Sequence, residues 1–389
     1  MPDPISRRSL IELGLASAAL AGPAAAADDG KVGFAVVGLG KLALGQIIPG
    51  FRNARSAKLA AVVSGHPDKA RRVAAEQGLP ADAIYSYDDY ERMAADPRIQ
   101  VVYIVLPNSL HAEYTIRALK AGKHVLCEKP MATSVADSEA MIAAARAANR
   151  KLMIAYRCHY EPLNLEVMRR LRSRSLGRTR LVVTDMGRQA DPAEPSDAWR
   201  LDMAMSGGGA LADMGVYGIN ASRYLLNEEP AEVRAWAHTD RSDLRFRTTE
   251  DLIAWQFRFP SGTIASGSTS FSYSGTMAFQ VFCEQGRLTA DPGAFYGGNR
   301  LTLQAGAPRD LTPPAEAGND QFAREMDWMA DAVRGRAPLV SPGEEGLQDM
   351  RLMQAILQSV AQGGATVPTD WGYRRAFDPA LVVDVPKTA

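Results

Sequence analysis

Three side chains have the types and spacing for acid–base chemistry on a bound substrate: Lys129, Asp213 and Tyr217. Asp213 and Tyr217 lie four residues apart, so they share one face if the segment is helical. An ammonium group beside a phenol can lower the phenol's pKa, and such a phenol can accept a proton near neutral pH. Each residue also has a structural interpretation: Lys129 as a surface lysine before a proline turn, and the other two as a helix start with a packed aromatic ring.

A role for Lys129 in ligand binding depends on where its element of secondary structure places it. It lies in Glu128-Lys129-Pro130, directly after a short apolar strand predicted at 124–127. Open α/β sheets bind their ligands at the carboxyl ends of the strands, so this position places Lys129 at a binding edge. Burial there would disfavour the ammonium form, and the positive ring of a bound nicotinamide would add to that effect.

A second pattern indicates what binds at this edge. The apolar run Val32–Val37 predicts a strand buried on both faces, and Gly38-Leu39-Gly40-Lys41-Leu42-Ala43 follows it before a helical segment at 42–51. The first glycine permits a tight turn, and the second lets the backbone approach a pyrophosphate at the helix N-terminus. The alanine allows close packing of helix on strand. The motif predicts a dinucleotide site, with a plain tight turn as the alternative.

The end of the next predicted strand, 58–63, bears on the choice of dinucleotide. An NAD site usually carries Asp or Glu about 20 residues past the turn, for the ribose diol. Here the chain reads Ser64-Gly65-His66, with Lys69 one turn later. Ser64 can donate a hydrogen bond to a 2′-phosphate and Lys69 can supply charge, so the sequence favours NADP. The alternative for Lys69 is a solvated helix residue.

The surrounding elements divide the chain into two predicted domains within the α/β class. Strands and helices alternate over residues 28–155, which predicts a Rossmann dinucleotide-binding domain with a parallel sheet. Residues 156–389 predict an α+β domain with an open, mainly antiparallel sheet. We expect helices on one face of that sheet and a second copy of the chain on the other, as a homodimer. The strands of the second domain are expected at 180–188, 232–238, 251–259, 263–271, 278–289 and 300–305.

Residues 1–27 have the features of an export signal. Arg7-Arg8 precedes a mildly apolar, Ala-rich stretch at 10–21, and Ala25-Ala26-Ala27 forms a small-residue cleavage site. The stretch is too short for a membrane span, and the paired arginines predict export by the twin-arginine machinery to the periplasm. A disordered Ala-rich tail is the alternative. Because there is no soluble nicotinamide pool outside the inner membrane, an exported enzyme would have to keep its nucleotide bound.

Composition argues against other classes of function. The 389 residues carry 44 Lys and Arg against 44 Asp and Glu. They contain no basic block, so no nucleic-acid partner is expected. Cys127, Cys158 and Cys283 are isolated, with no metal-ligand spacing and no disulfide framework. We therefore expect no metal and interpret the cysteines as buried thiols.

Several short motifs together resemble one family over essentially the whole chain after residue 27. The chain is similar to the glucose–fructose oxidoreductase and inositol dehydrogenase family, and within it to the sugar oxidoreductase branch. The motifs that carry the resemblance are Val37–Lys41, Leu106–His111, Cys127–Ala132, Tyr156–Tyr160, Trp199-Arg200 and Asp213–Tyr217. The last two of these motifs point to the sugar oxidoreductase branch.

The resemblance implies roles for individual residues. Tyr217 would be the acid and base at the reacting oxygen, Lys129 would orient the sugar and tune Tyr217, and Asp213 would bind a sugar hydroxyl. A further set would line or clamp the NADP. It comprises Gly38, Leu39, Gly40, Lys41, Leu42, Ser64, Gly65, Lys69, Leu106, Asn108, His111, Glu128 and Arg157, with Trp199, Arg200 and Tyr296 from the second domain.

The resemblance and the signal together imply a periplasmic oxidoreductase with tightly bound, non-dissociating NADP and monosaccharide substrates. One aldose would be oxidised at C1 to its lactone, and a second sugar, an aldose or a ketose, would be reduced to an alditol in the same pocket. An NADP-dependent aldose dehydrogenase that exchanges free cofactor is one alternative. A non-catalytic sugar-binding protein that keeps a nucleotide is another.

Overall fold

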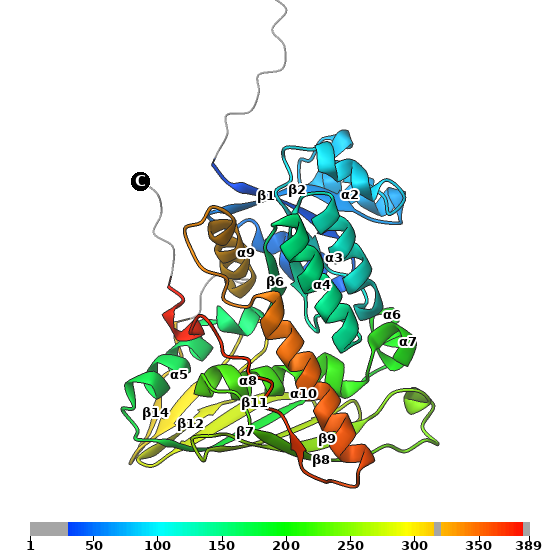
Figure 1. Cartoon of the computed structure of the whole chain (residues 1–389). Coiled ribbons are helices and arrows are strands. Elements are labelled where there is room, and N and C mark those ends of the chain that lie inside the picture. Colours follow the sequence, from blue (N-terminus) through cyan, green and yellow to red (C-terminus); the bar gives the residue numbers. More distant parts are fainter. Residues whose placement is uncertain (1–29, 315–319, 384–389) are drawn as a thin grey trace, which may run out of the picture. The chain divides into compact units, whose positions relative to one another are not determined.

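The computed structural model describes residues 30–314 and 320–383. The predicted export signal at 1–27 lies outside the described residues. From Lys31 onward the described chain forms one compact unit, which contains two β-sheets (Figure 1). No helix in these described ranges is long and apolar enough to cross a membrane.

The first sheet has six parallel strands in the order β3-β2-β1-β4-β5-β6. The order reverses between β1 (Val32–Val37) and β4 (Val101–Ile104), and the carboxyl edge beside such a reversal is where open α/β sheets bind ligands. This is the predicted Rossmann arrangement. The other strands are β2 (Ala57–Val63), β3 (Ile84–Tyr85), β5 (His124–Glu128) and β6 (Leu152–Ala155).

The connection after β1 differs from the regular helix expected at 42–51. Ala43–Ile47 forms a π-helical turn, η1, before the short helix α1 (Ile48–Gly50). Pro49 lacks the N–H that an uninterrupted α-helical ladder would use. The later connections are regular helices: α2 (Pro67–Glu76), α3 (His111–Lys120) and α4 (Val135–Ala148).

The second sheet has nine strands in the order β14-β13-β12-β11-β7-β10-β9-β8-β15. Only the neighbours β10 and β7 run parallel among the described strand pairs of this sheet, so it is mainly antiparallel, as predicted. Its strands are β7 (Thr179–Gly187), β8 (Glu232–His238), β9 (Leu252–Arg258), β10 (Ile264–Ser270), β11 (Thr276–Cys283), β12 (Gly286–Ala290), β13 (Leu301–Gln304), β14 (Pro308–Asp310) and β15 (Val367–Pro368).

The prediction of a single strand at 278–289 is wrong, because this segment is a hairpin. Cys283 of β11 pairs with Gly286 of β12, so the chain reverses at Glu284-Gln285. The backbone N–H groups of both turn residues donate to carbonyl oxygens of the segment just before β7. Glu and Gln are not typical turn residues, so Gly286 directly after them was the available signal of the turn.

Helices cover one face of the second sheet (Figure 1): α5 (Pro162–Ser173), α8 (Val216–Leu226) and α10 (Gly343–Ala361). Helix α10 contacts helix α4 and strand β6 of the first domain as well as strand β8 of the second sheet. Helix α9 (Asp320–Val333) contacts strand β2 of the first sheet. On the opposite face β9 presents alternate exposed residues, and Trp236 of β8 is 53% exposed.

Candidate active site

The turn after β1 has the geometry of a phosphate-binding loop. Gly38 adopts a φ of +94° and donates its N–H to Val63 O at 3.0 Å. A Cβ there would lie 2.3 Å from Val105 O, so only glycine fits. Gly40 and Lys41 are exposed, and the described residues supply no side-chain cap to the helical turn that follows. Uncapped backbone N–H groups at this position suit an anionic phosphate, so the loop fits a dinucleotide.

The residues at and after the end of β2 have side chains of the kind that the predicted 2′-phosphate contact needs. Ser64 is buried, and its Oγ accepts the N–H of His66 at 3.1 Å, which leaves the hydroxyl hydrogen to donate. Lys69 is half-buried in the first turn of α2. The choice of NADP over NAD stays a prediction. Four other residues predicted to contact the nucleotide follow strands of this sheet: Leu39, which is buried, Leu42 and Leu106, which are half-buried, and Gly65, which is exposed.

Two predicted nucleotide residues are bonded to the protein backbone. The ring nitrogens of His111 lie 2.9 Å from the carbonyl oxygens of Pro130 and Leu106, so the imidazole joins the loops after β5 and β4. Burial lowers the pKa of His111. Asn108 donates through Nδ2 to Ser206 O at 2.8 Å. Both side chains therefore fix the shape of the ligand edge, and their contact with a nucleotide stays a prediction.

Lys129, Asp213 and Tyr217 come together from different domains. Lys129 Nζ, at the end of β5, donates to the backbone oxygen of Asp213 at 2.8 Å and lies 3.6 Å from its carboxylate. The same Nζ lies 4.4 Å from the centre of the Tyr217 ring. The side chains of Lys129 and Asp213 are only 11% and 13% exposed. Lys129 is therefore not the surface lysine of the structural interpretation.

Cations surround the carboxylate of Asp213. Arg200 Nε lies 3.1 Å from Oδ1 and Arg188 Nη2 lies 3.3 Å from Oδ2. Burial raises the pKa of Asp213, but Arg200, Lys129 and Arg188 together hold it well below its ordinary value. Asp213 is therefore ionised at neutral pH. The Arg200 guanidinium lies 4.3 Å from the ring centre of Trp199, so these two predicted clamp residues contact each other, and Arg200 contacts Asp213.

Tyr217 lies against a second cation, Arg157. The Arg157 guanidinium carbon lies 4.9 Å from the centre of the Tyr217 ring and 4.6 Å from that of Tyr296. Burial raises the pKa of Tyr217, and Arg157 is the charge that lowers it most. The expectation that Lys129 brings this phenol close to neutral pH is wrong for the protein alone, because burial holds the pKa of Tyr217 above its ordinary value. Without a ligand, Tyr217 is a proton donor.

A small cavity lies on one side of Tyr217. Lys129, Tyr156, Tyr217 and Asn220 are among the residues that line it. Its volume of about 10 Å³ is on the scale of one water molecule. This cavity is therefore too small to hold a sugar-sized ligand.

Two glycines let α8 lie close to the second sheet. A Cβ at Gly218 would lie 2.7 Å from Thr184 Oγ1 of β7, and one at Gly215 would lie 3.1 Å from a threonine of β10. Tyr217 falls between them. The preceding turn, η7 (Leu211–Gly215), is π-helical and contains Asp213. The irregular turn and the close packing together fix where the phenol lies.

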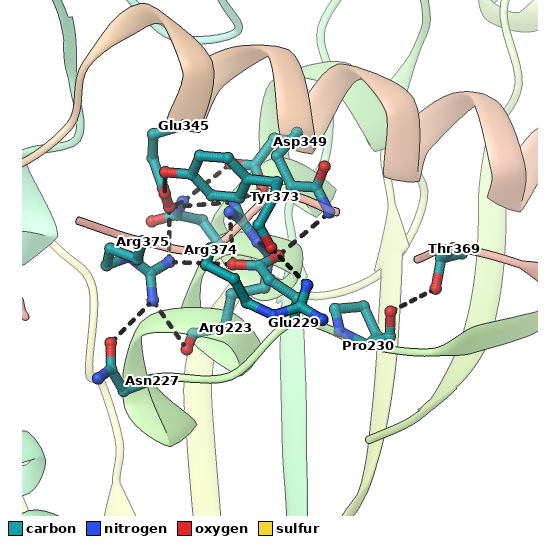
Figure 2. A network of polar contacts seen from close by, with 12 residues as sticks. Arg223, Asn227, Glu229, Pro230, Glu345, Asp349, Thr369, Tyr373, Arg374 and Arg375 are labelled. Atoms are coloured by element: carbon teal, nitrogen blue, oxygen red, sulfur yellow. Dashed lines mark hydrogen bonds and ion pairs between the residues drawn. The ribbon is translucent and has the colours of Figure 1, made fainter. Parts of the chain in front are cut away.

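Buried ions anchor the rest of α8 (Figure 2). Arg223 binds Glu229 through bonds of 2.7 and 3.0 Å, lies 3.0 Å from Glu345 Oε1 and also contacts Asp349. Arg375, from the C-terminal segment, binds Glu345 at 2.6 Å. These five side chains are at most 5% exposed. Removing one partner of a buried ion network costs about 3–5 kcal/mol, so the network holds α8 and its tyrosine in place.

Arg188 is a further residue of the site that was not predicted from the sequence. Its guanidinium forms two bonds of 2.7 and 2.8 Å with Asp197 and reaches Asp213. The available signal was an arginine at the very end of the strand expected at 180–188. Among residues 30–314 and 320–383, no group of three or more His, Cys, Asp and Glu is arranged to hold a metal ion.

The ligand edge described above is that of an oxidoreductase that uses a nicotinamide dinucleotide. Residues 32–156 match the model of an oxidoreductase family with an NAD-binding Rossmann fold, and residues 164–289 match the GFO/IDH/MocA C-terminal domain. The chain belongs to this GFO/IDH/MocA family of oxidoreductases. The family predicted from the motifs is thereby confirmed.

Individual relatives cover most of the chain. D-xylose 1-dehydrogenase [NADP(+)] of Haloarcula marismortui is 29% identical over 86% of this chain and 92% of its own length. D-xylose 1-dehydrogenase (NADP(+)) 2 of Haloferax volcanii is 30% identical over 87% of this chain and 99% of its own length. The crystal structure of aldose-aldose oxidoreductase from Caulobacter crescentus, complexed with glycerol, is 41% identical with a TM-score of 0.82, covering 87% of this chain and 99% of that one.

Proposed function

We propose that the protein is a sugar oxidoreductase with tightly bound NADP, which oxidises an aldose at C1 and passes the electrons to a second sugar. The observation that carries this proposal is the convergence of Lys129, Asp213 and Tyr217 at the carboxyl edge of the Rossmann sheet. Similarity at 41% identity to an aldose-aldose oxidoreductase supports the substrate class.

NADP, when bound, supplies a ring that takes hydride from one sugar and returns it to another, and its positive charge favours the phenolate of Tyr217. In the oxidising half, Tyr217 accepts the proton of the C1 hydroxyl, and the sugar leaves as a lactone. In the reducing half, Tyr217 returns that proton to the carbonyl oxygen of the second sugar, which leaves as an alditol. One hydride and one proton thus pass from the first sugar to the second through one pocket.

The other two residues position the sugar. The ionised carboxylate of Asp213 accepts hydrogen bonds from sugar hydroxyls, while its three cations keep it charged. Lys129 is held against the Asp213 backbone oxygen, so its ammonium stays over the phenol ring while sugars exchange.

The test of this exchange uses purified protein and sugar without added nucleotide. We expect lactone and alditol to form together in equal amounts. Formation of neither product would refute the exchange, and an absorbance spectrum of the protein as purified shows whether nucleotide is bound.

We also propose export to the periplasm by the twin-arginine route, supported by Arg7-Arg8 and the stretch that follows them. Retention of the nucleotide suits that compartment. Replacing both arginines by lysine should leave the protein in the cytoplasm, and cell fractionation measures this. Unchanged export would refute the route.

A homodimer through the exposed face of the second sheet is a further proposal. Exposed Trp236 and Ile264 on that face support it. Trp236→Glu should then shift the protein to a monomer in sedimentation or light scattering. A wild-type protein that is already monomeric would refute it.

A second candidate is an aldose dehydrogenase that exchanges free NADP. It is favoured by two relatives named D-xylose 1-dehydrogenase that cover 86% and 87% of this chain. This candidate predicts purified protein without nucleotide absorbance and activity only when NADP is added.

A further inference from the structure

A buried chain of three oxygen-bearing side chains runs beneath the ligand edge. Tyr103 Oη on β4 lies 2.9 Å from Glu128 Oε1 at the end of β5 and 3.2 Å from Glu325 Oε2 on α9. Tyr103 and Glu325 are 0% exposed and Glu128 is 8% exposed. The chain thus connects α9 to the residue that precedes Lys129.

Hydrogen counting constrains the protonation of this chain. A phenol carries one hydrogen, and an ionised carboxylate can only accept. Tyr103 can donate to one of the two carboxyl groups, so the second short contact requires a hydrogen from the other carboxyl. One of the two glutamates must therefore be a neutral acid for both contacts to be hydrogen bonds.

The surroundings show which glutamate carries the proton. Burial raises the pKa of Glu128, but the charges of Lys129 and Arg157 oppose this effect, and the backbone N–H of Lys129 donates to its carboxylate at 3.3 Å. Glu325 has no ion-pair partner in the described chain, and its Oε1 is buried without a hydrogen-bond partner. An ionised carboxylate in such a site would carry a large desolvation penalty. Glu325 is therefore the neutral acid.

The titratable groups that face Glu325 come from three elements. They are Glu128 and Tyr103 from the sheet, and Arg157, Cys158 and Tyr160 from the segment after β6. Burial raises the pKa of Glu325 well above its ordinary value and the charge of Glu128 raises it further, while Tyr103 and Arg157 act in the opposite direction. The raised pKa agrees with the hydrogen count.

We propose that Glu325 is a proton-carrying positioning residue: its carboxylic acid donates to Tyr103 Oη, Tyr103 donates to Glu128 Oε1, and the chain holds an ionised Glu128 at the cofactor edge. This rests on the proposed function only in that the edge binds a nicotinamide nucleotide. Glu325 does not act on the sugar. It acts through Tyr103 on the orientation of Glu128.

The protonation is tested by infrared spectroscopy on the purified protein, without sugar, at neutral pH. We expect a carbonyl band of a protonated carboxylic acid that is absent from Glu325→Gln and retained in the exposed control Glu139→Gln. A wild-type spectrum without this band, or a band that survives in Glu325→Gln, would overturn the proposal. Because no sugar is present, failure of sugar turnover does not affect this result.

The positioning is tested by NADP affinity in three variants. Glu325→Leu and Tyr103→Phe each break the chain, and we expect NADP to bind about tenfold more weakly, the scale of one lost hydrogen bond to a charged group. Glu325→Gln keeps an N–H donor toward Tyr103 and should restore most of that affinity. Equal losses in Glu325→Gln and Glu325→Leu would overturn the proposal. If Glu325→Leu does not fold, Tyr103→Phe against Glu325→Gln gives the same comparison.

Discussion

The ammonium group of Lys129 lies over the ring of Tyr217, 4.4 Å from its centre, and donates to the backbone oxygen of Asp213. The described contacts give Lys129 no direct hydrogen bond to the phenol oxygen, so any influence that it has on the phenol comes from its charge and its position over the ring. In the proposed mechanism, proton transfer to the substrate is therefore assigned to Tyr217.

Tyr217→Phe removes the only proposed proton carrier at the sugar oxygen. General acid–base groups contribute about 10²–10⁴-fold to rate, so reduction of bound NADP by an aldose should slow by about that factor. Nucleotide binding should persist, because the change deletes one hydroxyl. Single-turnover absorbance measures the first effect and nucleotide titration the second. Turnover at the wild-type rate would remove Tyr217 from its role.

Lys129→Met tests the ammonium group, with the exposed Lys120→Met as the matched control. A desolvated cation–π contact is worth about 2 kcal/mol, so we expect kcat to fall by roughly thirtyfold. Burial lowers the pKa of Lys129. Activity that needs the ammonium is therefore full at lower pH and is lost as pH rises through that lowered pKa. The kcat–pH profile of the wild type should show this alkaline limb, and the same limb in Lys129→Met would contradict the assignment.

Ser64→Asp tests the choice of nucleotide. A carboxylate at the end of β2 repels a 2′-phosphate and can bind a ribose diol, so the ratio of NADP to NAD affinity should fall by at least about tenfold, the scale of one charge-assisted hydrogen bond. Lys69→Met should weaken NADP binding and leave NAD binding unchanged. Titration of both nucleotides measures the ratio. An unaltered ratio in Ser64→Asp would reject the predicted 2′-phosphate contact.

Asp349→Asn tests the buried ions around α8. Burial raises the pKa of Asp349 from 3.8 to about 6, with Arg223 opposing and Glu345 adding to the shift. As pH falls, the folded protein therefore takes up a proton at Asp349 before the unfolded chain does. The contribution of this group to the free energy of unfolding is present at low pH and is lost as pH rises through about 6. Denaturant unfolding at pH 5 and pH 7 should show a smaller pH difference in the variant than in the wild type. Identical differences would show that Asp349 does not titrate in this range.

The local parts of the site were predictable from sequence because short-range patterns determine them. Gly38 has a positive φ and no room for a Cβ, and the apolar run before it is fully buried. These constraints act within a few residues of one another. The turn at Glu284-Gln285 was missed because its backbone is satisfied by a distant segment rather than by turn residues.

Contacts across the chain could not be predicted from sequence. Tyr103 and Glu325 lie 222 residues apart, and no periodicity or motif relates them. The placement of Arg157 against two tyrosine rings depends in the same way on packing between segments far apart in the chain. Sequence patterns therefore identified residues that the structure brings together at the candidate site but did not identify their partners.

The bond from Lys129 to the Asp213 backbone joins the two halves of the molecule. One half contributes the amine and the dinucleotide turn, while the other contributes the phenol and the carboxylate. Expressed as separate fragments, each half would therefore be inert, and mixing them would regain turnover only to the extent that they reassociate. In such a complementation assay, catalysis would report docking of the fragments.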